Sequence, residues 1–439
     1  MSVSERTLVS ALVAVVLLGS GFAGAQAFPS SGAFSLYADW SNRNSKDTDE
    51  DSDFSEIIAM FSWYSEPDSD SMFEFGLDTR IATFPSSENR DERISLYDAW
   101  VGLKGKSDNW TLRLGQMWIR DLGGIGSVGG LYGEYRLPKE SSFGRWRFGL
   151  FGGLEPKIMD AGYVDDIAKG GAYVAVDGER GRRHVLGWVM IRNDDLTERS
   201  VIVFNNFIPV GRKFLIYEAL EYDLEGPGGQ GDGGLSYFFT NLRYTFSRVV
   251  NVQGTYHRGR SLNARLITED ILQGRPIDPE RLERLLYESG RIRVNVNPWR
   301  NIRLWAGYGR ERSNDGDDWY PRTEFGAAVN NIGGIGFDVA ASNYRIDRGD
   351  QSYDSIYASL GKTFGRKVYV SLDYTSSLSV FTYEDAQGGT VEVSPESDRW
   401  ALSTNVSLNR TFSLLLIGEW IDHDDFEETR ALAGMTIRF

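Results

Sequence analysis

The sequence contains no cysteine, only 12 prolines and only three histidines among its 439 residues. The absence of cysteine excludes disulfides, thiolate metal sites and cysteine nucleophiles. The chain also lacks HExxH and GxSxG motifs, and His257 is its only plausible general base. We therefore expect neither an enzyme nor a bound cofactor or metal ion.

Long apolar runs are absent from residues 28–439. A membrane-spanning helix needs about 20 consecutive apolar residues, so a helical membrane protein is excluded. Hydrophobic residues make up 41% of the chain, aromatic residues 13%, and there are 49 glycines. A β-barrel in a membrane needs apolar side chains only at alternate positions, which fits this composition. The net charge of −15 argues against nucleic acid as a partner.

The first 27 residues have the pattern of a secretory signal peptide. Arg6 precedes an apolar core from Leu8 to Leu18, and Ala25-Gln26-Ala27 offers a small-x-small cleavage site. An uncleaved anchor is the alternative, but about 11 apolar residues are too few to span a bilayer comfortably. We predict a signal peptide over residues 1–27 and one domain over residues 28–439.

From residue 33 onward, apolar and polar residues alternate in segments of about ten, which is typical of strands with one apolar face. In Met72–Thr83, for example, Phe73, Phe75 and Leu77 share one face. We predict an all-β fold, a single closed antiparallel transmembrane β-barrel of about 22 strands, within a range of 18–22. The segments begin near residues 33, 54, 72, 93, 110, 131, 144, 170, 183, 199, 213, 235, 249, 291, 302, 322, 334, 352, 367, 398, 411 and 429.

The connections between these segments alternate in length. Gly105–Asn109 and Gly365–Arg366 are short, whereas Asn42–Asp53, Lys157–Lys169 and Ser261–Gly290 are long. Short periplasmic turns and long outer loops are the arrangement of bacterial outer-membrane barrels. We therefore expect the outer membrane of a Gram-negative cell, with both chain ends on the periplasmic side.

The longest connection, Ser261–Gly290, carries a helix signal. Asp278 is a plausible N-cap, Pro279 suits the first helical position, and Gly290 is a C-terminal stop. This loop is either a lid packed on neighbouring outer loops, which we favour, or a constriction folded into the pore.

The chain ends in Phe439, on a strand whose apolar face includes Ile437 and Met435. A terminal Phe of this kind resembles the signal recognised by the outer-membrane barrel assembly machinery, which is an expected partner. Two further segments, Ser95–Gly105 and Trp110–Gln116, resemble the "AYVGLKG" and "LGRQ" strands of Gram-negative porins. Gln116 stands where the family has Arg, and the following Asp121–Gly130 is shorter than the family's constriction loop.

The resemblance implies a channel for passive diffusion of small hydrophilic or charged solutes. The polar faces of the strands would then line the pore, where charge sets selectivity. Alternatively, these charges pair across strands and fill a wet interior. The candidate pore-lining residues are Arg113, Arg136, Arg145, Arg147, Arg291, Arg293, Arg303, Glu74, Asp78, Asp98 and Glu134.

Other functions remain open at this point. A barrel of about 22 strands usually holds a plug, so a lumen or periplasmic partner protein is a second hypothesis, as in polysaccharide export or a multihaem electron conduit. A structural or adhesive barrel is a third. Two acidic segments would meet lipopolysaccharide through loosely held divalent ions. They contain Asp47, Asp49, Glu50, Asp51 and Asp53, and Asp422, Asp424, Asp425, Glu427 and Glu428.

Overall fold

The computed structural model describes residues 29–439 except 49–50, 67–69, 87–89, 91, 158–159, 230–231, 262–263, 274–284, 314–317, 349–350 and 385–389. The predicted signal peptide, residues 1–27, lies outside the described residues. Within this part of the chain, nearly all secondary structure is β-strand, and no helix is long and apolar enough to cross a membrane.

The strands follow the alternating segments of the sequence. They are β1 (Ser30–Ser45), β2 (Asp51–Ser65), β3 (Phe73–Thr83), β4 (Arg93–Lys104), β5 (Trp110–Trp118), β6 (Ser127–Arg136), β7 (Arg145–Pro156), β8 (Tyr163–Asp177), β9 (Arg183–Asn193), β10 (Leu196–Val210), β11 (Phe214–Glu225), β12 (Asp232–Thr245), β13 (Val250–Ser261), β14 (Leu285–Trp299), β15 (Ile302–Ser313), β16 (Tyr320–Ile332), β17 (Phe337–Asp347), β18 (Gln351–Phe364), β19 (Val368–Glu384), β20 (Thr390–Val393), β21 (Glu396–Ser407), β22 (Phe412–His423) and β23 (Phe426–Arg438).

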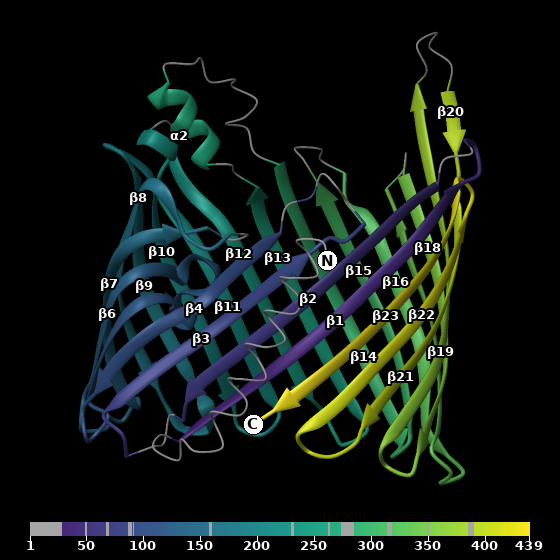
Figure 1. The fold of residues 1–439 in the computed structure, drawn as a ribbon, viewed down its shortest axis with the longest axis horizontal. Helices are drawn as coiled ribbons and strands as arrows, with labels where there is room; N and C mark the ends of the chain where they lie inside the picture. Colours follow the sequence, from purple (N-terminus) through teal and green to yellow (C-terminus); the bar gives the residue numbers. More distant parts are fainter. Residues whose placement is uncertain are drawn as a thin grey trace, which may run out of the picture.

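Successive strands pair antiparallel, except that β19 pairs with β21 past the short β20, and β1 closes the ring against β23 (Figure 1). Twenty-two of the 23 strands build the wall, because β20 pairs only with the outer end of β19. Closure leaves no unpaired sheet edge, which lipid could not satisfy. The predicted single barrel of about 22 strands is confirmed.

The two ends of the barrel-forming chain meet at one rim. The backbone N–H of Gly32 donates to the carbonyl of Phe439 at 2.9 Å, and the N–H of Phe439 donates back at 3.1 Å. The Phe439 ring stacks on Phe61 with centroids 6.2 Å apart. The opposite rim carries β20 and the short helix α2 (Ala264–Leu272), which lie in two of the long connections (Figure 1). Long connections face outward in bacterial barrels, so the rim with β20 and α2 is the outer rim.

The outer face of the wall carries the large exposed apolar side chains at alternate strand positions. On β7 and β21, Leu150 and Leu402 are 67% and 53% exposed, while Arg147 and Ser403 on the same strands point the other way and form polar contacts. An apolar exterior on a closed sheet is the signature of a barrel inserted in lipid. The protein is therefore an outer-membrane β-barrel.

One cluster of three polar side chains interrupts this apolar exterior. Glu218 on β11 accepts a hydrogen bond from Asn206 at 3.2 Å, and Asn206 contacts the His184 ring nitrogen at 2.8 Å. Cross-strand pairing thus satisfies these side chains within the sheet.

The predicted long loops are shorter than expected, because strand pairing continues beyond the apolar band. The predicted loop Lys157–Lys169 ends where β8 begins at Tyr163, and the two ends of the predicted loop Asn42–Asp53 belong to β1 and β2. The predicted helix at Asp278–Gly290 is wrong from residue 285 onward, where Leu285 begins β14. Pairing with β13 overrides local helix propensity there. Residues 274–284, including Asp278, Pro279 and Leu282, lie outside the described residues.

The helix of this loop is instead α2. Its Ile267 and Thr268 are fully buried, and its Ile271 packs beside Gly228 in the next outer loop. Arg265 holds Glu155 at 3.2 Å and Glu198 at 3.5 Å. The described part of the loop thus packs on its neighbours at the rim, as the lid interpretation expects.

The two faces of β21 allow a direct test of insertion. We expect Leu402→Arg to destabilise the barrel by about 2–4 kcal/mol, because it places a charge on the lipid face. Its neighbour Ala401 faces inward, paired with Asp373 and Glu419, so Ala401→Arg should change stability by less than about 1 kcal/mol. Urea unfolding of the barrel in phospholipid vesicles measures both. Equal losses for the two variants would contradict the assigned orientation.

Candidate functional site

The candidate site is the inner face of the barrel. Cross-strand register joins Glu74, Gly102, Arg113, Tyr132 and Phe151 into one inward row across β3 to β7. All eleven predicted pore-lining residues fall on inward positions of their strands. These are Arg113, Arg136, Arg145, Arg147, Arg291, Arg293, Arg303, Glu74, Asp78, Asp98 and Glu134. Their role in selecting solutes stays a prediction.

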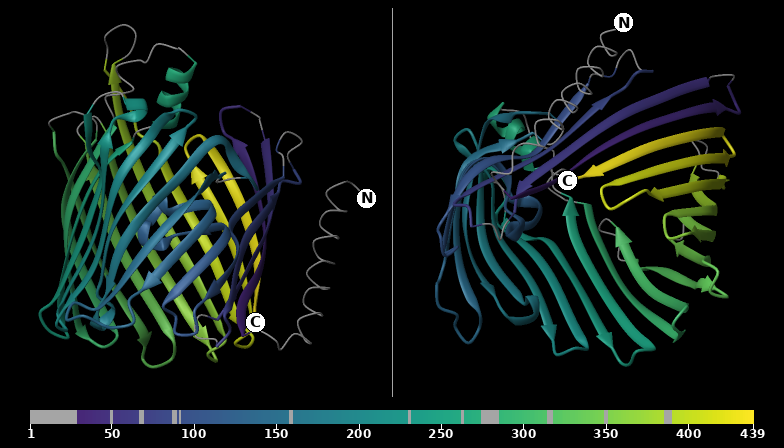
Figure 2. Two further views of the ribbon diagram at one scale, coloured as in Figure 1. Left: turned by 90° about the vertical axis from the view of Figure 1, so that its left-hand side faces the viewer. Right: turned by 60° about the horizontal axis from the view of Figure 1, so that its bottom comes forward.

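A segment of the chain folds into the barrel after β5. It is the short 3₁₀ stretch η1 (Arg120–Gly126), whose coil lies within the ring of strands (Figure 2). The N–H of Ile119 donates to the carbonyl of Gly126 at 2.9 Å, which closes the loop on itself. The segment expected to be too short for a constriction loop therefore does enter the interior.

The glycine of the porin-like Leu114-Gly115-Gln116 motif is required by the backbone just before this turn. Gly115 has a φ of +128°, and a Cβ there would lie 2.2 Å from the carbonyl oxygen of Ala99. Only glycine tolerates both conditions. Gln116, which stands in place of the family's Arg, is 3% exposed and does not reach the interior as a charge.

Apolar packing docks η1 on one wall. Leu122 is fully buried against β9 and β10, in a cluster that includes Val185, Val189 and Val203. Gly187 makes room, because a Cβ there would lie 2.4 Å from Leu122 Cδ2. Full burial of one leucine contributes about 1.5–3 kcal/mol.

Asp121 fastens the same segment by charge and hydrogen bonds. Its carboxylate lies 2.7 Å from Arg147 Nη1 and 3.1 Å from Arg183 Nη1. Its backbone carbonyl accepts a hydrogen bond from Asn205 Nδ2 at 2.7 Å. The constriction is thus held by side chains from β7, β9 and β10.

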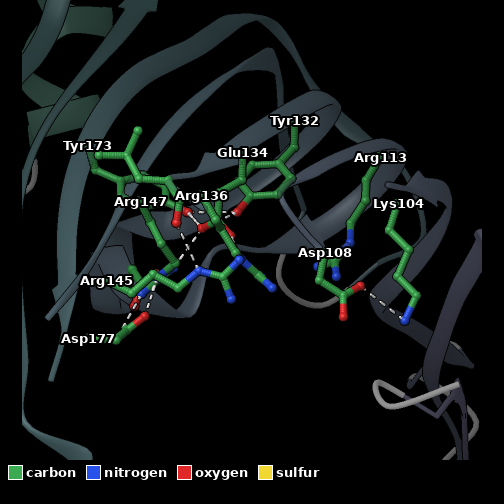
Figure 3. A network of polar contacts seen from close by, with 12 residues as sticks. Lys104, Asp108, Arg113, Tyr132, Glu134, Arg136, Arg145, Arg147, Tyr173 and Asp177 are labelled. Atoms are coloured by element: carbon green, nitrogen blue, oxygen red, sulfur yellow. Dashed lines mark hydrogen bonds and ion pairs between the residues drawn. The ribbon is translucent and has the colours of Figure 1, made fainter. Parts of the chain in front are cut away.

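Glu134 is the centre of a buried polar cluster formed by side chains of β6, β7 and β8 (Figure 3). Its side chain is 2% exposed and lies 2.6 Å from Arg147 Nη1 and 2.7 Å from Arg136 Nε. The hydroxyls of Tyr132 and Tyr173 also donate to it. Arg147 in turn binds Asp177 at 2.5 Å.

The remaining predicted residues of this wall are also paired. Arg113 binds Glu74 at 3.0 Å and lies over the Trp100 ring at 4.1 Å. Tyr64 Oη donates to Asp98 at 2.8 Å and to Asp78 at 3.3 Å. Arg145 makes one hydrogen bond, to the carbonyl of Leu137. On β3 to β7 the charges therefore mostly satisfy one another.

The opposite wall has an excess of positive charge. Arg291 and Arg293 on β14 share one carboxylate, that of Glu324, at 3.2 and 3.5 Å. Within the described part of the chain, Arg303 and Arg243 form no ion pair, and both are exposed on inward positions of β15 and β12. This wall can attract anions or the anionic groups of solutes.

From β17 to β21 the inner face carries many hydroxyls beside the charged groups of Asp373 and Arg399. Ser371 and Ser403 share a hydrogen bond of 2.7 Å, and Tyr357 Oη donates to Asp373 at 2.6 Å. Tyr353 and Tyr357 are 37% and 36% exposed although they face inward. The described apolar core cluster lies only on the wall that η1 covers.

A cavity of about 1240 Å³ lies between η1 and β9 to β13. Its lining includes Arg120, Asp121, Asn205, Glu221 and His257. His257 packs among Tyr237 and Tyr287, with ring centroids 5.4 Å from each.

The two acidic segments meet at the outer rim through the β1–β23 seam. The N–H of Lys46 donates to the carbonyl of Asp425, and its ammonium lies 2.5 Å from Asp422, which raises the pKa of Lys46. Asp49 and Glu50 lie outside the described residues. Among the described side chains, no group of three carboxylates or histidines is placed to hold a metal ion.

A second sequence feature, besides the alternation of apolar and polar residues, indicates that η1 folds inward. In β9 and β10, Val185 and Val189 alternate with Leu186 and Trp188, so both strand faces are apolar. Strands of this kind are buried on both faces. In a barrel, this predicts that something covers the inner face there.

No family model and no curated protein matches this chain. A mutant ferric enterobactin receptor (PfeA) from Pseudomonas aeruginosa matches with a TM-score of 0.56 and 10% identity, over 94% of this chain and 81% of that chain. OccK3 from the same organism matches with 0.45 and 12%, over 95% and 99%. OccAB4 from Acinetobacter baumannii matches with 0.41 and 13%, over 94% and 99%. The receptor match shows a shared fold.

Two arginines on the inner face of β7 provide a matched test of the polar cluster. We expect Arg147→Ala to cost about 3–5 kcal/mol of stability, because Glu134 and Asp121 lose a buried partner. Arg145→Ala, two residues away and partly exposed, should cost less than about 0.5 kcal/mol. Urea unfolding in vesicles compares them. A stability loss shared equally by both would show that the cluster does not hold this wall.

Proposed function

We propose that this barrel is a water-filled channel for passive diffusion of small hydrophilic or charged solutes. The observation that carries the proposal is the contrast between the two halves of the interior. The apolar cluster and η1 occupy the wall from β5 to β10, whereas β14 to β23 present polar, solvent-accessible side chains inward. A polar, accessible lining is what an aqueous path requires.

The inward segment gives the channel its narrowing. A 22-stranded wall encloses more space than side chains alone can fill, and such barrels usually hold a plug. Here η1 projects from one wall and leaves a cavity of about 1240 Å³ beside it. The chain's own loop therefore supplies part of what a separate plug would supply.

Charge on the wall from β12 to β15 biases which solutes pass. Arg243, Arg291, Arg293 and Arg303 face inward there, and Glu324 compensates only part of their charge. A charged wall of low dielectric focuses its field on permeating ions. Anions and solutes with carboxylate or phosphate groups should be favoured.

Planar-bilayer recordings test this bias. Under a salt gradient, we expect Arg291→Gln combined with Arg293→Gln and Arg303→Gln to shift the reversal potential toward cations. Three positive charges are lost, and Glu324 is left unpaired. Arg310→Gln, on the outward face of β15, is the control and should produce no shift. An unchanged reversal potential in the triple variant would remove the charge bias from the proposal.

The narrowing by η1 is tested by opposite substitutions. Leu122→Ala removes the side chain that docks the segment, so single-channel conductance should rise. At Gly124 a Cβ would meet nothing within 4 Å, so Gly124→Trp adds bulk to open space and conductance should fall. If neither variant changes conductance, η1 does not narrow the path.

A barrel that surrounds a partner protein is the competing function. In that case the purified barrel would show either no conductance or a very large one. A second protein would also co-purify with it in a fixed ratio. A stable conductance without a partner would instead favour the channel.

A further inference from the structure

The residues that follow the apolar band toward the outer rim differ from one part of the barrel to another. On β15 the outward positions run Ile302, Leu304, Ala306 and Tyr308, and then change to Arg310 and Arg312 toward the outer rim. On β13 they run Val250, Val252, Gly254 and Tyr256, and then reach Arg258. On β17 Arg345 follows Val339, Ala341 and Asn343.

These four arginines face outward rather than into the interior. Tyr256, on the same face as Arg258, packs on Phe238 with centroids 5.8 Å apart, while the intervening His257 lines the interior cavity. Tyr308, on the same face as Arg310, is 54% exposed. Arg310 and Arg345 are themselves exposed. We call Arg258, Arg310, Arg312 and Arg345 the arginine sector.

The arginine sector sets four arginines against two carboxylates. Glu288 lies opposite Arg258 and Arg312, and Asp354 on β18 lies opposite Arg345. Arg312 binds Glu288 at 2.6 Å, and Arg312 also lies over the Trp319 ring. Within the described residues, the other three arginines form no ion pair. The Nε of Arg258 is buried without a hydrogen-bond partner.

Strands β21 and β22 carry acidic side chains at the same boundary. Asp398 lies beyond Trp400 toward the outer rim on β21, and Asp422 lies beyond Trp420 on β22. Because the apolar band ends at each of these positions, they lie at the level of lipid headgroups. At this level, β13 to β17 therefore present arginine where β21 and β22 present aspartate.

We propose that the arginine sector binds the phosphate groups of a phosphorylated glycolipid, such as lipid A, in the outer leaflet. A guanidinium matches a phosphate with two parallel hydrogen bonds, and its stem can lie along apolar surface while its head reaches the headgroups. The contact is direct, since the two carboxylates at this sector, Glu288 and Asp354, already lie opposite its arginines rather than being free to hold bridging divalent ions. The proposal depends on insertion in the membrane and not on channel function.

The test uses the full barrel purified in detergent and titrated with bisphosphorylated lipid A, with bound lipid counted by native mass spectrometry. The variant combines Arg258→Gln, Arg310→Gln and Arg345→Gln, and keeps Arg312 because Glu288 depends on it. The matched control combines Arg291→Gln, Arg293→Gln and Arg303→Gln, which removes as many charges from the inward face. We expect at least a tenfold loss of affinity in the variant and none in the control.

Two further arms separate the sources of binding. Dephosphorylated lipid A should bind the native barrel as weakly as bisphosphorylated lipid A binds the variant. EDTA should not change the affinity of the native barrel for bisphosphorylated lipid A. Equal affinity of variant and native barrel, equal binding of the dephosphorylated lipid, or loss of binding in EDTA would each overturn the proposal. Arg310→Gln alone, at an exposed position, gives the same comparison should the triple variant fail to fold.

Discussion

Pairing of the β1 backbone with β23 is the constraint on which the rest of this structure depends. In lipid, every strand N–H and C=O needs a partner within the protein, so a sheet is stable there only if it closes. Closure fixes which face of every strand is inside, because side chains alternate with a period of two. The exterior of Leu150 and Leu402 and the interior of Arg147 and Ser403 follow from that one condition.

Within this frame, the interior is divided into a covered wall and an accessible one. Leu122 and Asp121 attach η1 to β7, β9 and β10, where both strand faces are apolar or tightly paired. Across the lumen, Arg303 and the tyrosines of β18 stay accessible. Buried charge therefore holds η1 on its wall, whereas the charge of the accessible wall stays exposed to the interior. The same residue type thus has two physical roles, set by burial.

Alternation in the sequence predicted the strands well because the period of two is imposed by lipid on every strand. The predicted starts near residues 93, 110, 183 and 302 coincide with β4, β5, β9 and β15. The inward position of Glu134 followed from the same pattern, but its four partners did not, since they come from β6, β7 and β8 and meet only in three dimensions. The ends of the strands and the helix α2 were missed because pairing past the bilayer depends on neighbours, not on local composition. The inward fold of η1 was missed because length was judged instead of the apolar faces of β9 and β10.

Because η1 is attached to a single wall, the width of the interior can change without a change in the barrel wall. Contacts of the segment involve one side of the ring, so a larger residue at Gly124 would not alter strand number, shear or lipid contact. The width of the interior and the construction of the wall can therefore diverge independently in evolution.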